Sequence, residues 1–261
     1  MLQDYTRADK QLHWLSQIIA KANRTYVPAR EDDSHTNLSY HHGVKQIRGR
    51  WFESKTGRLI FIYNLENQQI EILNRYFETV AIFNTIGNSY NQLQKEIERA
   101  LPALGLDPTG FLDDLHFQIP DYCFSEQPIQ EIPADAIRAW THFRQLANDA
   151  CELLTDDFQQ AVVPRIWPHH FDTRVYFEPD NKLGLGFGLA MEDGLRDMPY
   201  FYFSAYGLNG NDVDYSGFAP LQSGKWINEN WKGAVLGIHE VKSKQDLINF
   251  KQEVLKVYLN N

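Results

Sequence analysis

The chain has 261 residues, and 43% of them are hydrophobic, which is enough to bury the core of one large domain or two small ones. Its formal net charge is −9 at pH 7 with scattered basic residues, which argues against nucleic acid or an anionic membrane as a partner. No segment approaches the roughly 18 consecutive apolar residues of a membrane-spanning helix, and the N-terminus has no apolar signal segment. We therefore expect a soluble, cytoplasmic protein without a nucleic-acid or membrane partner.

Cysteine usage agrees with a reducing compartment. The two cysteines, Cys123 and Cys151, are far apart and form neither a CxxC motif nor a metal-ligand spacing. The aromatic content of 13% is unusual for a chain of this length. It indicates either a large aromatic core or an aromatic-lined pocket.

The first part of the chain has the pattern helix, strands, helix. Apolar residues at helical spacing predict an amphipathic helix over residues 9–23. Strands are then predicted over residues 37–50, 58–64, 68–74 and 79–84. A capping box of Ser89 and Gln92 opens the next helix, and Gly105 ends it.

An irregular segment separates this part from the next. Residues 107–131 contain three prolines and no periodic pattern, which predicts a linker draped over the surface. The chain is therefore divided into a helix-sheet-helix unit at 1–106, the linker 107–131, and a second helix-sheet-helix unit at 132–261. Whether the two units pack as one domain stays open.

The second unit repeats the order of the first. Pro133 opens a helix that runs to about Gln160, and a final helix begins at Ser243. Strands that cluster between helix pairs predict an α+β fold with antiparallel sheets flanked by helices. Each half also carries a His-His pair in its first predicted strand, at 41–42 and at 169–170. A duplication that produced two helix-meander-helix repeats would explain this order, but the same order of elements also arises by chance.

Residues 165–207 hold three strand-like runs with strict alternation. In the run from Arg165, Trp167, His169 and Phe171 fall on one predicted face, and His170 and Asp172 fall on the other. Glycines 184, 186 and 188 share a face of the second run, and tyrosines 200, 202 and 206 share a face of the third. Glycine is costly in a strand, so a neighbouring group is expected to fill the bare strip.

Several of these segments resemble an uncharacterised bacterial family known only as a domain of unknown function. The resemblance rests on the helix ACELLTDDF, the strand ending HHFD, the glycine-alternating strand and the segment MPYFYFSAYG. The tract WKGAVL and the N-terminal helix LHWLSQIIAKAN extend it over nearly the whole chain. The resemblance implies no activity, and it assigns no catalytic residue or cofactor.

Two kinds of site follow from the residues themselves. The first is an aromatic-lined pocket in a small-molecule-binding protein, roofed by the loop over residues 226–231. Its predicted ligand-binding residues are Tyr200, Tyr202, Tyr206, Trp226, Trp231 and Gly186. The alternative is a metal-dependent hydrolase or oxygenase that uses the His-x-Asp pair of His170 and Asp172, with His169 beside it.

The aromatic pocket is the favoured hypothesis. Two neighbouring ligands do not complete a metal site, so we expect His169 to be a hydrogen-bonded core histidine and His170 with Asp172 to be a solvated surface pair. No stoichiometric metal is expected on this interpretation. A purely structural interaction protein is a third possibility, and the sequence assigns neither an oligomeric state nor a ligand.

Overall fold

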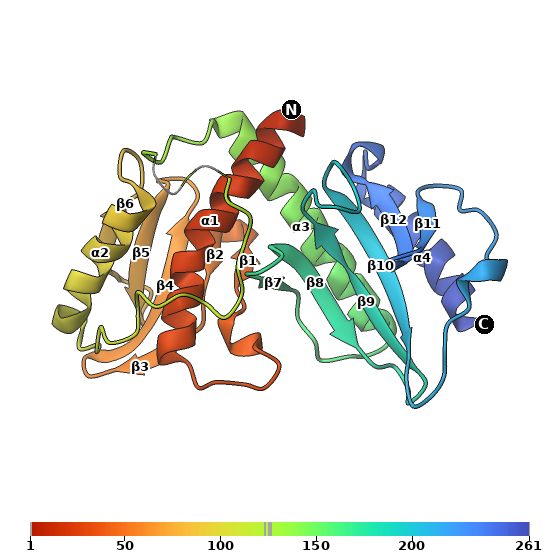
Figure 1. Ribbon diagram of the computed structural model, residues 1–261, viewed down its shortest axis with the longest axis horizontal. Helices are drawn as coiled ribbons and strands as arrows, with labels where there is room; N and C mark the ends of the chain where they lie inside the picture. The colour runs from red at the N-terminus through yellow and green to blue at the C-terminus, as the bar shows by residue number, and fades with distance from the viewer. Residues whose placement is uncertain (1, 123, 125–126, 261) are drawn as a thin grey trace. The chain divides into compact units, whose positions relative to one another are not determined.

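The computed structural model describes residues 2–122, 124 and 127–260 (Figure 1). This part of the chain contains four α-helices and two six-stranded antiparallel sheets, which confirms the predicted α+β class. It divides into two compact units, one formed by Gln3–Thr141 with Ile166–Phe171 and the other by His142–Arg165 with the chain from Asp172 onward. None of the described helices is long and apolar enough to cross a membrane.

The first unit is a sheet with helices before and after it. Helix α1 (Leu2–Tyr26) comes first, and α2 (Tyr90–Ala100) follows the sheet and continues into a 3-10 turn, η3 (Leu101–Leu104). The strands are β1 (Ser39–His41), β2 (Gln46–Arg48), β3 (Phe52–Ser54), β4 (Gly57–Asn64), β5 (Gln69–Asn74) and β6 (Thr79–Asn84). The sheet order is β1-β2-β4-β5-β6, and β3 also pairs with β4.

Helix α1 lies directly against this sheet. Its apolar stripe is fully buried, as are Phe61 and Tyr63 of β4. A methyl group on Gly49 would lie 2.6 Å from Asn23 Oδ1 and 2.8 Å from Ile19 Cγ2, so only glycine permits this approach. The helix predicted at 9–23 is confirmed and is longer at both ends.

The strand predicted over residues 37–50 is wrong as a single strand. The chain turns through a 3-10 segment, η2 (His42–Val44), and Lys45 has a left-handed φ of 47°. Strand β2 therefore pairs back on β1, with Tyr40 opposite Ile47. Positive φ is uncommon for a residue other than glycine, so the reversal at Lys45 was not predicted, although Gly43 within the turn is a breaker residue.

The second unit is a sheet covered on one face by two helices. The helices are α3 (Ala134–Asp157), of which residues 142–157 belong to this unit, and α4 (Lys244–Leu259). The strands of the sheet are β7 (Arg165–Trp167), β8 (Asp172–Phe177), β9 (Leu183–Ala190), β10 (Tyr200–Gly207), β11 (Lys225–Asn228) and β12 (Lys232–Gly237). Of β7, only Arg165 is assigned to the second unit. Their order is β11-β12-β10-β9-β8-β7.

Both helices contact the same sheet face. Cys151 Sγ of α3 donates to the Phe187 carbonyl at 3.5 Å, and the Tyr258 hydroxyl of α4 donates to the Phe203 carbonyl at 2.7 Å. Lys251 of α4 pairs with Asp157 of α3 at 2.6 Å. Figure 1 shows both helices behind the strands of this sheet. The opposite face carries the glycines of β9.

The continuous strand predicted from Arg165 is interrupted. Residues 168–171 form a turn after β7, in which Phe171 has a φ of 50° and its amide donates to the Trp167 carbonyl. Pro168 has no amide hydrogen to donate to a sheet, which favours a break there. Alternation is confirmed only from residue 172, where Val175 and Phe177 are buried.

The strand order does not confirm the repeat. The first sheet has its strands in chain order except for β3, which lies off the path, whereas in the second sheet β12 lies between β10 and β11. The His-His pairs are also not equivalent, because His41 ends β1 while His169 and His170 lie in a turn. Cys123 lies outside the described residues, and Cys151 is buried.

Candidate functional site

The predicted glycine and tyrosine faces do lie side by side in the second unit. In the register of β9 with β10, Gly188 is opposite Tyr202, Gly186 is opposite Ser204, and Gly184 is opposite Tyr206. Cross-strand partners share a sheet face, so these side chains project from the face that α3 and α4 leave uncovered. The predicted adjacency of the glycine and tyrosine faces is therefore confirmed.

Neighbouring side chains already fill much of the glycine strip. The Tyr176 ring occupies the position that a Cβ on Gly184 would take, and Ser204 Oγ lies 2.8 Å from a Cβ on Gly186. Tyr176 and Tyr206 meet edge to face, with 6.1 Å between ring centroids. The tyrosines on either side of β9 therefore pack against the glycines.

The two predicted tryptophans lie on opposite faces of the sheet. Trp231 covers Gly233 and meets Tyr202 edge to face, with ring centroids 6.1 Å apart. Trp226 instead packs on the helix side, against Tyr215 and the α4 residue Tyr258. The structure brings Trp231 to the tyrosine face and places Trp226 in a separate aromatic cluster.

Asp172 is buried rather than solvated. Only 5% of it is exposed, and its Oδ2 accepts a 2.7 Å hydrogen bond from the Tyr202 hydroxyl. The Arg174 guanidinium lies 3.8 Å from the same oxygen. Burial, and then the charge of Asp172, raise the pKa of Tyr202 well above its usual value. The expectation of a solvated surface carboxylate is therefore wrong, and Tyr202 is a neutral donor.

The metal alternative gains no third ligand. His169 and His170 belong to the first unit and Asp172 belongs to the second. Within the described residues, no group of three or more His, Cys, Asp or Glu side chains is arranged to hold a metal ion.

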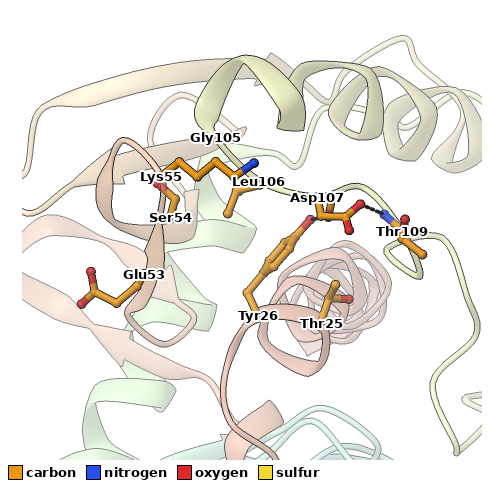
Figure 2. A pocket seen from close by; sticks show the side chains of 9 residues that line it. All are labelled: Thr25, Tyr26, Glu53, Ser54, Lys55, Gly105, Leu106, Asp107 and Thr109. Atoms are coloured by element: carbon orange, nitrogen blue, oxygen red, sulfur yellow. Dashed lines mark hydrogen bonds between the residues drawn. The ribbon is translucent and has the colours of Figure 1, made fainter.

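The first unit contains an open groove that the sequence did not predict (Figure 2). Its volume is about 450 Å³, and it lies between the end of α1, the β3–β4 turn and the chain after η3. The Tyr26 hydroxyl points across it and donates to the Asp107 carbonyl at 2.8 Å, while the Asp107 carboxylate accepts from the Thr109 amide. Burial raises the pKa of Tyr26 to about 12. Tyr26, Asp107 and Thr109 of this groove are thus bonded to one another.

A second cavity of the first unit has aromatic rings in its walls beside polar side chains. It has a volume of about 440 Å³ and lies between α1, α2 and residues 114–121, and we call it the α1–α2 cavity. Its lining includes Trp14, Gln17, Lys21, Tyr90, Gln94 and Phe117. Trp14 and Tyr90 meet edge to face with ring centroids 4.9 Å apart.

The outer wall of the α1–α2 cavity is the segment that the sequence predicts to be a linker. Hydrogen bonds from α1 hold it in place: Arg24 donates to the carbonyls of Gly110, Asp113 and Asp114 at 2.8–3.0 Å. Trp14 Nε1 donates to the Pro120 carbonyl at 3.1 Å. These bonds fix the wall on the helix, so the cavity is built into the first unit.

Lys21 is the charged group of the α1–α2 cavity. It is 7% exposed, and its Nζ donates to Gln94 Oε1 at 2.9 Å and to the Leu112 carbonyl at 3.1 Å. The closest carboxylate oxygen that it pairs with is Asp114 Oδ1, at 3.9 Å. Burial lowers the pKa of Lys21, which Asp114 and Asp113 partly offset and Arg24 reinforces.

The sequence analysis missed Lys21. It lies seven residues after Trp14 and four after Gln17, so the three share one face of α1 beside the apolar stripe. That spacing was a usable signal, but a lysine beside an apolar stripe normally indicates a solvent-facing side. The ammonium group is buried because α2 and residues 112–121 cover this face.

Comparison with known proteins gives no relative. No family model matches the chain, and neither a curated protein nor a solved structure is significantly similar to it. The resemblance to an uncharacterised bacterial family stays a prediction, and function must be argued from the geometry described above.

Proposed function

We propose that the protein is a cytoplasmic small-molecule-binding protein and that its ligand occupies the α1–α2 cavity. The observation that carries this proposal is the combination of size and lining. A volume of about 440 Å³ lies in the usual range for a small-molecule site, and its wall combines aromatic rings with polar side chains. This proposal retains the hypothesis of an aromatic-lined pocket, but its rings are Trp14, Tyr90 and Phe117 and not the residues predicted from the sequence.

The two other surfaces support ligand binding less well. On the tyrosine face of the second sheet, Tyr176 and Tyr206 pack on glycines. In the groove of Figure 2, the Tyr26 hydroxyl and the Asp107 carboxylate already bond to protein groups. The buried carboxylate of the tyrosine face, Asp172, already accepts a hydrogen bond from the Tyr202 hydroxyl. The α1–α2 cavity instead presents a buried cation, Lys21, beside the Trp14 ring.

The proposal is tested by blocking the cavity. Asn91 of α2 lines it and is exposed, so Asn91→Trp should fill the entrance and leave the fold intact, while Asn91→Ala keeps the entrance open. We expect ring-containing fragments, screened by saturation-transfer NMR, to bind the wild type and Asn91→Ala about equally. Asn91→Trp should weaken them about tenfold or more, because the ring and the fragment compete for the same volume.

Two outcomes would contradict this. One is a screen without any binder to the wild-type protein. The other is a set of binders whose affinities do not change in Asn91→Trp while its melting temperature matches that of the wild type.

A further inference from the structure

Lys21 is a buried cation whose hydrogen-bond partners are neutral. Its ammonium group has three donors, and two of them are directed at the Gln94 amide oxygen and the Leu112 carbonyl. Asp114 Oδ1 at 3.9 Å is beyond hydrogen-bond distance, and the Asp114 side chain is fully exposed. Buried charges in proteins are normally paired at close range, so this one lacks a close counter-ion.

Resting on the function proposed above, we infer that the ligand of the α1–α2 cavity is an organic monoanion, a carboxylate joined to an aromatic or similarly flat ring. The Lys21 ammonium group is its charge partner. A carboxylate oxygen at ordinary hydrogen-bond distance would supply the close counter-charge, in a charge-assisted bond that is stronger than either bond to a neutral oxygen. The ring would lie against Trp14 and the neighbouring apolar wall.

The other charged groups near Lys21 set the limit on ligand charge. Arg24 lies on the same helix as Lys21, and its guanidinium group donates hydrogen bonds to three carbonyls of the wall segment. In that segment, the Asp113 and Asp114 carboxylates attract the ammonium group electrostatically. Asp121 also lines the cavity. One buried cation among these carboxylates suits a single negative charge and disfavours a dianion such as a phosphate monoester.

The position of Lys21 is fixed before a ligand arrives. The Gln94 amide holds the ammonium group from α2, and the Leu112 carbonyl holds it from the wall. A charged group that is already oriented loses little conformational entropy on binding. This distinguishes Lys21 from Lys95, which is exposed on α2 and does not line the cavity.

The experiment compares ring-bearing acids with their own amides. Isothermal titration at pH 7 and low salt would use phenylacetate, benzoate and indole-3-acetate, each paired with the corresponding carboxamide. We expect each acid that binds to bind more tightly than its amide. Lys21→Gln should weaken the acids about tenfold or more, as the loss of a hydrogen bond to a charged group implies, and should leave the amides nearly unchanged.

Two matched variants separate the role of Lys21 from a general charge effect. Lys95→Gln makes the same change of net charge on the exposed side of α2 and should leave every affinity unchanged. Asp114→Asn removes the competing carboxylate while keeping Lys21, and it should tighten acid binding. Lys21→Arg should recover part of the acid affinity, and melting curves would show that each variant is folded.

The outcomes distinguish a wrong anion specificity from a wrong assignment of small-molecule binding to this cavity. If acids and amides bind equally and Asn91→Trp blocks both, the cavity binds small molecules but the inferred anion specificity is wrong. If no acid in the panel depends on Lys21, or if Asp114→Asn weakens acid binding, the inference is also wrong. If nothing binds and Asn91→Trp changes no titration, the proposed function fails with it.

Discussion

At the scale of single residues, Lys21 links the cavity to the pH dependence of folding. Burial lowers its pKa in the folded protein below the usual value of about 10.5. The unfolded chain therefore holds this proton more tightly between the two values. The free energy of unfolding contributed by Lys21 rises as pH increases through that window, because the unfavourable buried charge is lost.

The pH dependence of the free energy of unfolding can be tested with a variant that lacks the Lys21 ammonium group. The difference in free energy of unfolding between wild type and Lys21→Gln should shift in favour of the wild type as pH rises from neutral toward the usual lysine pKa of about 10.5. Urea denaturation at several pH values measures it, and the subtraction cancels the titration of tyrosines and other groups. Acid binding in the cavity should weaken over the same range. A difference that stays flat or falls with pH would contradict the proposed environment of Lys21.

At the scale of elements, strand β9 depends on its glycines for packing. A methyl group on Gly188 would overlap the Thr173 carbonyl and lie 2.8 Å from Arg174 Cβ, and a backbone atom on β8 cannot turn aside. Gly186 is opposed instead by Ser204 Oγ, the end of a short side chain. The obstruction is therefore more severe at Gly188 than at Gly186.

The corresponding prediction is a graded loss of stability. Gly188→Ala and Gly186→Val should each lower the free energy of unfolding by about 1–3 kcal/mol, and Gly186→Ala by less. Gly194→Ala serves as the control, because nothing lies within 4 Å of its added methyl group, and it should stay within about 0.5 kcal/mol of the wild type. Equal stability of Gly188→Ala and Gly194→Ala in urea denaturation would show that β9 and β8 are not packed this closely.

Elements with local signals were predictable from the sequence. The capping box of Ser89 with Gln92 and the left-handed Gly105 are both present, because each depends on residues within a few positions of one another. The pairing of β9 with β10 also follows the predicted alternation. Such signals need no knowledge of the rest of the chain.

Other features depend on contacts that the sequence does not display. The turns at Lys45 and Phe171 use left-handed φ at residues other than glycine, so the predicted strands run through both, although Gly43 and Pro168 lie within the turns. The α1–α2 cavity joins Lys21 to Gln94 and Leu112, which are 73 and 91 positions away. Periodicity reports which side of a helix is apolar, but it does not report which distant segment covers the other side.

At the scale of the whole molecule, net charge and one sheet edge together lead us to expect self-association that depends on pH. Among the strands that the structure describes, β6 pairs only with β5, and Figure 1 shows it at the edge of its sheet. Large apolar side chains are exposed on β6 and beside it, at Tyr76, Phe77, Val80, Ile82 and Ile86. No residue of Thr79–Asn84 is charged, so this edge lacks the charges that commonly prevent strand pairing between chains.

The last prediction concerns pH and this edge. At pH 7 the formal net charge of −9 keeps copies of the chain apart, and this repulsion vanishes near the sequence pI of about 5.5. Light scattering should therefore show association that grows as pH falls toward 5.5, and Ile82→Lys should reduce it by placing a charge on β6. Val163→Lys makes the same charge change at another exposed apolar side chain outside the strands and should reduce it much less. Equal reduction by both variants would mean that association near the pI depends on total charge and not on the open edge of β6.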